Sequence, residues 1–382
     1  MVRKDRATLT LTVEVKPVKT RSVAVASMAL IATFGLAACS SGTGTTSSSA
    51  ADSSAATGAA VSGSLTAEGA TSQKNAFDYF KVQFTAANPD ATFDYNPTGS
   101  GSGQKQFLAS TVDFAGSDSP FDEQQAADAI ERCGGNPAWH LPMVVGPIAV
   151  AYNLDGVTDL TISTATLAKI FLGEITNWND PTIAGENPGV TLPDQNIQVI
   201  FRSEESGTSD NFQKFLAATN PGVWTTSGKS FPTAVGAGAN GSTGVTGEVK
   251  NTAGAITYVE SGYAEQEGLS IAKIDFGNGP VELTPETVNA ALADVQFSGE
   301  GNDLVVDAEA LFAENGAGYY PLVMTTYEIV CSAGYDAEKS ALVKAFLNTA
   351  LSSQDDTFAS LGYIPVSGPY KEKLQTAIDA IA

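Results

Sequence analysis

IQVIFRSEESGTSDNF, residues 197–212, decides the fold class, because it joins a strand pattern to a helix pattern through a polar turn. The apolar run 197–201 is typical of a buried strand, whereas Phe212, Phe215 and Leu216 recur at helical spacing. A strand, a turn and a helix in this order form the repeating unit of an α/β protein. We therefore expect an α/β fold.

The turn itself carries groups that bind anions. The first N–H groups of a helix lack backbone partners and point, with the helix dipole, at whatever lies in front of them. Arg202 adds a planar guanidinium, and the Ser-Gly-Thr run at 206–208 adds hydroxyl and backbone donors. The alternative is an ordinary helix N-cap, with Arg202 in a surface ion pair with Glu204 or Glu205.

Length and charge limit the possible functions. A chain of 382 residues that is 43% hydrophobic can bury a large core, in two domains. The formal charge of −22 argues against nucleic acid or an anionic membrane surface as a broad partner. Any anion must therefore be held by local donors rather than by the overall field.

The N-terminal residues have the composition of an export signal. Six of the 20 Lys and Arg residues precede the uncharged run 22–38, a pattern that predicts a signal peptide over residues 1–38. The run ends in Leu-Ala-Ala-Cys at 36–39, which resembles the bacterial lipobox and makes Cys39 the expected lipidation site. The alternative, a single membrane-spanning anchor, is disfavoured because the apolar part is short. Residues 39–63 are rich in Ser, Thr, Gly and Ala and predict a flexible tether.

Two further cysteines, Cys133 and Cys331, remain in this exported chain. In an oxidising compartment the natural interpretation is a disulfide between them. Two separate buried thiols are the alternative, because the sequence does not give the distance between the two residues.

From residue 64 onward strand and helix patterns alternate. Strands are expected at 64–67, 92–96 and 111–116, and each ends in small polar residues. The second is followed by the glycine-rich turn 97–103, which fails both common nucleotide motifs because Gln104 stands where each requires glycine. What remains is a flexible backbone that a ligand can approach closely.

The sequence gives little support to catalysis. Its one histidine, His140, precedes the apolar strand pattern 141–150, so neither a multi-histidine metal site nor several Ser-His pairs can be built. We expect His140 to be a satisfied core or rim residue, and we predict no catalytic residue, no metal site and no cofactor.

Together, several motifs in this order resemble the PstS-type phosphate-binding lipoproteins of phosphate ABC transporters, a type II periplasmic-binding-protein family. The similarity runs from about residue 65 to the C-terminus. The matching segments are Gly69-Ala70-Thr71, Gly99 to Gly103, Val112 to Asp118, Ile170 to Asp180, Arg202 to Ser209 and Gly254 to Glu260.

The resemblance implies a set of phosphate ligands. The anion would accept hydrogen bonds from hydroxyls, two backbone N–H groups and a guanidinium, while one acid would accept the proton of the phosphate. The hydroxyls belong to Thr71, Ser100, Ser206 and Thr208, the N–H groups to Ser72 and Gly207, the guanidinium to Arg202 and the acid to Asp118. Glu204 would pair with Arg202. Ser72 departs from the phenylalanine common at this position, which need not matter if only its N–H is used but could loosen the pocket wall.

The resemblance also implies two α/β lobes joined by two crossing strands, with the ligand in the cleft between the lobes. The apolar stretches 142–152 and 320–329 suit the crossings. The first lobe would then comprise residues 64–147 and 322–382, and the second lobe residues 148–321. Binding would close the lobes, because only the closed form brings both sets of donors to the anion.

The implied function is capture of inorganic phosphate and its delivery to a membrane permease driven by a cytoplasmic ATPase. The expected protein is a monomer that does not bind nucleic acid and is held by a palmitate-bearing lipid anchor on the extracellular face of the cytoplasmic membrane. The alternatives are binding of another tetrahedral oxyanion such as sulfate, hydrolysis of phosphate esters, and a role as a surface antigen or adhesin.

Overall fold

The computed structural model describes residues 60–232, 234–314 and 316–382. The predicted signal peptide, the lipidation site Cys39 and most of the predicted tether lie outside these residues. Within the described part of the chain, no helix is both long and apolar enough to cross a membrane.

The described chain is organised around one mixed sheet. Its strand order is β2-β1-β3-β12-β4-β8-β6-β7, and β9 pairs with β4 beside this path. The strands are β1 (Gly63–Gly69), β2 (Ala91–Pro97), β3 (Phe114–Ser117), β4 (Ala138–Asn153), β6 (Gln198–Arg202), β7 (Ala237–Ala239), β8 (Ala255–Glu260), β9 (Ser270–Ile271) and β12 (Val323–Cys331). A smaller sheet has the order β11-β10-β5, formed by Pro280–Val281, Lys273–Asp275 and Thr161–Ser163.

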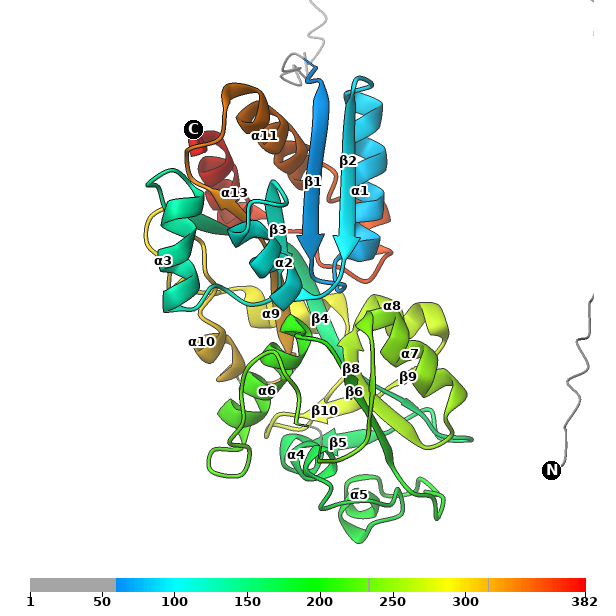
Figure 1. Ribbon diagram of the computed structural model, residues 1–382. Helices are drawn as coiled ribbons and strands as arrows, with labels where there is room; N and C mark the ends of the chain where they lie inside the picture. Colours follow the sequence, from blue (N-terminus) through cyan, green and yellow to red (C-terminus); the bar gives the residue numbers. More distant parts are fainter. Residues whose placement is uncertain (1–59, 233, 315) are drawn as a thin grey trace, which may run out of the picture. The chain divides into compact units, whose positions relative to one another are not determined.

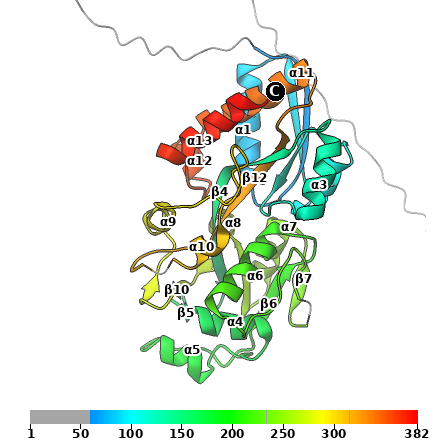
Figure 2. The same cartoon turned by 90° about the vertical axis from the view of Figure 1, so that its left-hand side faces the viewer.

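Two strands, β4 and β12, connect the parts of the molecule that lie at the top and at the bottom of Figure 1, called the upper and lower parts below, and Figure 2 labels both strands. β4 is antiparallel to β12 over residues 138–147, and from Ile148 to Asn153 it pairs instead with β8. All nine residues of β12 and nearly all of β4 are buried, as expected for central strands covered on both faces. The predicted crossing strands and the two-lobe α/β fold are therefore confirmed.

Helices cover both faces of the sheet (Figures 1 and 2). In the upper part these are α1 (Lys74–Ala87), α2 (Ser100–Leu108), α3 (Glu123–Arg132), α11 (Ala337–Ser352), α12 (Asp356–Ala359) and α13 (Gly368–Ala380). Those of the lower part include α4 (Thr164–Leu172), α5 (Pro181–Glu186), α6 (Gly207–Thr219), α7 (Gly241–Asn251) and α8 (Ser261–Glu267). The short α9 (Pro285–Leu292) and α10 (Ala308–Phe312) lie beside the crossing strands.

An aromatic cluster joins the two ends of the chain in the upper part. Phe346 of α11 lies with its ring centroid 5.4 Å from Phe77, 4.1 Å from Phe93 and 5.5 Å from Phe114. Phe84 of α1 contacts the same ring at 5.6 Å. α11 therefore packs on α1, β2 and β3 from the beginning of the described chain, and residues between them in sequence build the lower part.

The third predicted strand begins later than expected, at Phe114 rather than residue 111. The reason is that Asp113 binds the neighbouring strand with its side chain: its Oδ2 accepts from the Thr66 N–H at 2.7 Å and from Lys339 Nζ at 2.9 Å. These bonds hold Asp113 in an irregular segment before the strand.

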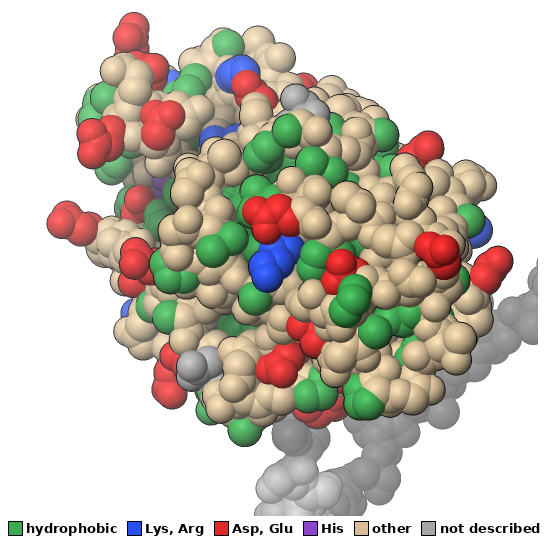
Figure 3. All heavy atoms as spheres, turned by 90° about the horizontal axis from the view of Figure 1, so that it is seen from below, with side chains coloured by type: hydrophobic (Ala, Val, Ile, Leu, Met, Phe, Trp, Pro, Cys, Tyr) green, Lys and Arg blue, Asp and Glu red, His purple; other side chains and the backbone are tan. Residues whose placement is uncertain are grey.

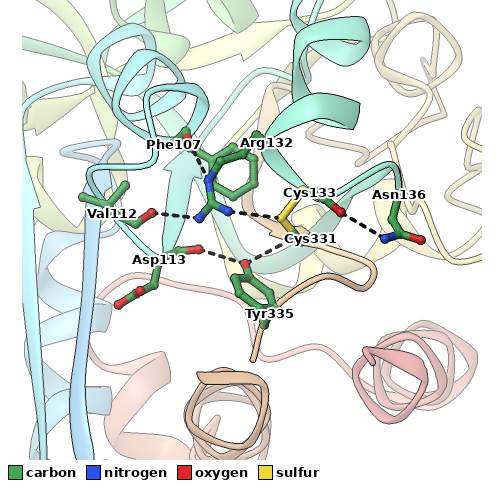
Figure 4. The surroundings of a disulfide bond; sticks show 8 residues. All are labelled: Phe107, Val112, Asp113, Arg132, Cys133, Asn136, Cys331 and Tyr335. Carbon is green, nitrogen blue, oxygen red and sulfur yellow. Dashed lines mark hydrogen bonds between the residues drawn. A yellow bond between two sulfur atoms is a disulfide. The ribbon is translucent and has the colours of Figure 1, made fainter. Parts of the chain in front are cut away.

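The predicted disulfide between Cys133 and Cys331 is present. It links the residue after α3 to the last residue of β12, across a sequence separation of 198. Figure 4 shows Arg132 donating beside it to the carbonyl oxygens of Phe107 and Val112, at 2.9 and 3.2 Å. The bond therefore ties together the two chain segments through which the lower part is inserted into the upper part.

The surface matches the acidic composition. Figure 3 shows one face of the molecule, on which acidic side chains are spread widely and basic ones are few. No broad positive field on this face would attract an anion.

Removing the disulfide should destabilise the protein. Closing so long a loop restricts the unfolded chain, so the double change Cys133→Ala and Cys331→Ala should lower the free energy of unfolding by about 2–5 kcal/mol. Urea denaturation of both proteins at neutral pH measures this loss. An unchanged midpoint would show that the bond adds nothing to stability.

Candidate anion-binding site

The predicted anion-binding residues lie where strands of the main sheet end. Thr71 and Ser72 follow β1, Asp118 follows β3, and Arg202 ends β6. Ligand sites of α/β sheets form at the carboxyl ends of such strands. The structure brings together Thr71, Ser72, Ser100, Asp118, Arg202, Glu204, Gly207 and Thr208, which are linked by hydrogen bonds to one another.

Arg202 is at the centre of this cluster. Its Nη2 donates to Thr71 Oγ1 at 2.6 Å, and its Nη1 donates to Thr208 Oγ1 at 3.1 Å. Its Nε donates to Glu204 Oε1 at 2.7 Å, and Nη2 contacts the same oxygen. The Arg202 side chain is 1% exposed and that of Glu204 12%, so the ion pair is not at the surface. Burial lowers the pKa of Arg202, but Glu204 and Glu260 outweigh this effect and raise it, which keeps the guanidinium charged.

Glu204 also fixes a second element of the lower part. Its carboxylate accepts from the Gly241 N–H, with distances of 3.1 and 3.2 Å to its two oxygens. Gly241 is the first residue of α7. The residue that pairs with the arginine therefore also holds the start of the helix beside it.

Asp118 is buried and accepts several hydroxyl hydrogen bonds. Its Oδ1 accepts from Ser72 at 2.6 Å and from Thr326 at 2.8 Å, and its Oδ2 has longer contacts with Ser100 and Thr208, at 3.4 and 3.5 Å. Burial raises the pKa of Asp118 to about 6, with a further rise from the charge of Glu260. The hydroxyls of Ser72 and Thr326 and the charge of Arg202 act in the opposite direction.

Gly207 allows the closest backbone approach in the site. A Cβ atom there would lie 2.5 Å from the Ser100 oxygen and 2.5 Å from Asp118 Cβ. The Gly207 N–H donates to Ser100 Oγ at 3.2 Å, across the boundary between the upper and lower parts. A larger residue would push these two turns apart.

Ser206 has a different position from its neighbours. Its hydroxyl accepts from the Ser209 N–H at 3.2 Å and caps α6. Its own N–H donates to the Lys229 carbonyl oxygen at 3.0 Å. In this structure the helix-cap interpretation describes Ser206 correctly, and its contact with an anion stays a prediction.

Three site residues were missed by sequence reasoning. Ser242 Oγ lies 3.1 Å from Thr71 Oγ1 and accepts from Arg202 Nη1 at 3.3 Å. Glu260 is 1% exposed and accepts from Thr208 Oγ1 at 2.6 Å. Thr326, the third, contacts Asp118 from β12. Ser242 follows a strand in the same way as the predicted residues, but β7 is only three residues long and leaves no strand pattern.

The cluster is not positively charged overall. Around Arg202 lie three carboxylates, those of Glu204, Glu260 and Asp118. Two tyrosines fix the backbone nearby, since Tyr263 donates to the Thr71 carbonyl oxygen at 2.7 Å and Tyr363 to that of Ser72 at 2.6 Å. The cluster therefore offers an anion a pattern of hydrogen-bond donors and acceptors rather than a net positive charge.

A cavity of about 550 Å³ borders the cluster. Asp118 is the predicted site residue that lines it, together with Pro120, Asn211, Lys214 and Tyr327 among others. Asn211, which also lines the cavity, donates from its Nδ2 to the Asp118 carbonyl oxygen at 2.7 Å. The carboxylate therefore lies between the cavity and the hydroxyl cluster.

The raised pKa of Asp118 makes ligand-free stability depend on pH. The folded state binds this proton more tightly than the unfolded chain does, so the contribution of Asp118 to stability rises as pH falls from about 7 toward 4. Ligand-free Asp118→Asn should therefore be more stable than the wild type at pH 7.5, by at most about 3 kcal/mol. The difference should shrink toward pH 4.

Urea denaturation at several pH values measures this effect, with Asp90→Asn at an exposed position as the matched control. Parallel pH profiles of Asp118→Asn and wild type would show that Asp118 is not the group responsible.

Comparisons with known proteins give the family. Residues 54–354 match the model of the PBP superfamily domain. Phosphate-binding protein PstS 3 of Mycobacterium tuberculosis (strain ATCC 25618 / H37Rv) is 45% identical over 321 residues, 83% of this chain and 86% of that protein. Phosphate-binding protein PstS 2 of the same strain is 41% identical over 367 residues, 95% of this chain and 99% of that protein.

Solved structures agree on the fold. A high-affinity periplasmic phosphate-binding protein solved with bound phosphate aligns with a TM-score of 0.66 at 21% identity, over 82% of this chain and 93% of that one. A phosphate-binding protein from Stenotrophomonas maltophilia aligns at 0.62 with 20% identity, over 82% and 93%. The family match and the two Mycobacterium tuberculosis relatives show that the chain belongs to the PBP superfamily and, within it, to the family of PstS phosphate-binding proteins.

Proposed function

We propose that this protein binds inorganic phosphate outside the cytoplasmic membrane and delivers it to the permease of a phosphate ABC transporter, which a cytoplasmic ATPase drives. Family membership supports the transport role. The observation that carries the ligand is that Arg202 and Asp118 lie in one buried cluster and share the Thr208 hydroxyl. A guanidinium fork suits an oxyanion, and an acid beside it suits an oxyanion that carries its own proton.

The proposed ligand set is the predicted one. Phosphate would accept from the hydroxyls of Thr71, Ser100, Ser206 and Thr208, from the N–H groups of Ser72 and Gly207, and from Arg202, while Asp118 would accept its proton. Contacts between these groups, Ser206 excepted, support the set, because donors that now bond to one another can exchange those bonds for bonds to an anion. The position of Ser242, between Thr71 and Arg202, adds it as a further donor.

We propose lobe boundaries at 147/148 and 321/322. The exchange of the β4 partner from β12 to β8 between Pro147 and Ile148 supports the first boundary. The packing of Phe346 on β2 and β3 supports assigning 322–382 to the first lobe with 64–147, and leaves 148–321 as the second lobe. Thr71 and Asp118 then lie on one lobe and Arg202 on the other, so that binding favours closure.

The proposed location rests on sequence alone. Export by the signal peptide 1–38 and acylation of Cys39 would leave a monomer on the extracellular face, held by the tether 39–63. Adjacent permease and ATPase genes would distinguish transport from a role as a surface antigen.

We assign no enzymatic activity and no cofactor. The His140 ring is used within the fold, since its Nε2 accepts from the Phe121 N–H at 3.0 Å and its Nδ1 donates to Asp303 at 2.8 Å. With both nitrogens bonded, His140 is not placed to activate a nucleophile.

Phosphate should stabilise the ligand-stripped protein. A ligand that binds only the folded state adds roughly 2.7 kcal/mol at about a hundred times its dissociation constant. Thermal denaturation with phosphate should show a raised Tm, and equal concentrations of sulfate should have little effect. No shift in millimolar phosphate would refute the proposed function.

Arg202 should not tolerate replacement. Arg202→Lys loses the bidentate fork, and Arg202→Ala also removes the ion-pair partner of the half-buried Glu204. Isothermal titration should show weaker phosphate binding in both, by at least about tenfold, with alanine the weaker. Arg132→Lys, which changes an arginine bound to backbone carbonyls beside the disulfide, is the matched control and should bind normally. If Arg202→Ala binds phosphate with wild-type affinity, the phosphate site lies elsewhere in the protein.

A further inference from the structure

The two oxygens of the Asp118 carboxylate have different surroundings. Oδ1 accepts two short hydroxyl bonds, from Ser72 at 2.6 Å and Thr326 at 2.8 Å. The contacts of Oδ2, with Ser100 and Thr208, are 3.4 and 3.5 Å long and close to the limit of a hydrogen bond. One oxygen is therefore held by the protein, while the other keeps most of its capacity to accept.

Ser72 takes part through its side chain, beyond the N–H that the family resemblance implies. The residue is fully buried, and its carbonyl oxygen is fixed by Tyr363. A phenylalanine at this position, common in the family, would offer no donor to Asp118. The Ser72 hydroxyl therefore supplies Asp118 with a hydrogen bond that an apolar side chain at this position would not supply.

Thr326 reaches the carboxylate from the crossing strand. It is 1% exposed, and the register of β12 against β4 shifts between Thr326 and Tyr327. Irregularities of this kind re-aim side chains beside functional sites. Thr326 Oγ1 also lies 3.5 Å from Ser72 Oγ, so the two hydroxyls converge on one oxygen.

Two hydroxyl donors favour the ionised and fixed form of a carboxylate. An ionised Asp118 can accept the hydroxyl of phosphate, and it repels an anion that has no hydroxyl. A protonated Asp118 could instead donate to such an anion. Discrimination between phosphate and sulfate therefore depends on what holds the carboxylate ionised.

We propose that Ser72 and Thr326 are specificity-determining residues, which hold Asp118 Oδ1 so that Oδ2 accepts the phosphate hydroxyl and the site rejects sulfate. This inference rests on the proposed function. It assigns the two hydroxyls to positioning the acid, whereas the binding energy comes mainly from the other donors.

Other ionisable groups near Asp118 set the background for its protonation. Burial raises the pKa of Glu328 well above its ordinary value, and the charge of Asp118 raises it further, whereas a hydrogen bond from Gln73 acts in the opposite direction. The remaining groups around the carboxylate come from β2, β6, β8, β12, α6, α8 and the loop after α12. They are Tyr95, Arg202, Glu260, Tyr327, the Asp210–Lys214 pair reached through Ser119, Tyr263 and Tyr363.

The test is titration of phosphate and sulfate into wild type, Ser72→Ala, Thr326→Val and the double variant between pH 5.5 and 8. We expect phosphate affinity to stay within about tenfold, whereas the ratio of sulfate to phosphate dissociation constants falls by at least about tenfold, roughly the value of one hydrogen bond to a charged group. The pH below which wild type admits sulfate, near the pKa of about 6, should move upward in the variants.

Two controls make the result specific. Thr326→Ser keeps the hydroxyl and should restore selectivity, and Thr325→Val removes a neighbouring buried hydroxyl of the same strand and should change nothing. If Thr326→Val does not fold, the result for Ser72→Ala tests the inference alone, because this change removes only one oxygen atom from the side chain.

Variants with wild-type selectivity and an unchanged pH profile would overturn the inference and leave the proposed function intact. A wild type that binds no phosphate would instead refute the proposed function itself.

Discussion

A buried guanidinium constrains the rest of the site. A charge as enclosed as that of Arg202 is tolerated only when its N–H groups are paired, and here the partners are Glu204, Thr71, Thr208 and Ser242. These partners follow different strands or open different helices, so the arginine is satisfied only when several chain segments meet. One side chain therefore couples the ends of two strands, the starts of two helices and the contact between the two parts of the molecule.

The same cluster shows why a strongly acidic protein can hold an anion. Positive charge alone would attract phosphate and sulfate alike, but the acids around Arg202 leave a site that depends on the pattern of donors and acceptors. The ionised form of Asp118 is destabilised in this cluster, because burial and the charge of the nearby Glu260 raise its pKa. The ligand-free protein holds a carboxylate in unfavourable surroundings, as is common where function requires a perturbed group.

The sequence predicted most of the fold and only part of the site. Long or strongly periodic patterns, such as the crossing strands and the apolar face of α6 formed by Phe212, Phe215 and Leu216, were found because burial determines them directly. The predicted start of β3 was wrong because the Asp113 side chain accepts the Thr66 N–H, which a regular ladder would pair with a backbone carbonyl oxygen. Ser242 and Thr326 were missed for other reasons: a three-residue strand leaves no pattern, and no single-sequence signal marks a register shift. The Ser72 hydroxyl was undervalued because the resemblance drew attention to its N–H alone.

The placement of Thr326 has a consequence for the order of events in binding. On the proposed lobe division, Asp118, Ser72 and Ser100 belong to the first lobe, and Thr326 belongs to a strand paired with β3 and β4 of the same sheet. None of these groups needs the second lobe to hold the carboxylate. On the same proposal Arg202, Gly207 and Thr208 belong to the second lobe, and closure would bring them to the anion. On this proposal the Asp118 carboxylate is already positioned in the open form, before Arg202 reaches the ligand. An anion without a proton would be repelled by this carboxylate, and closure of the lobes around it would be disfavoured.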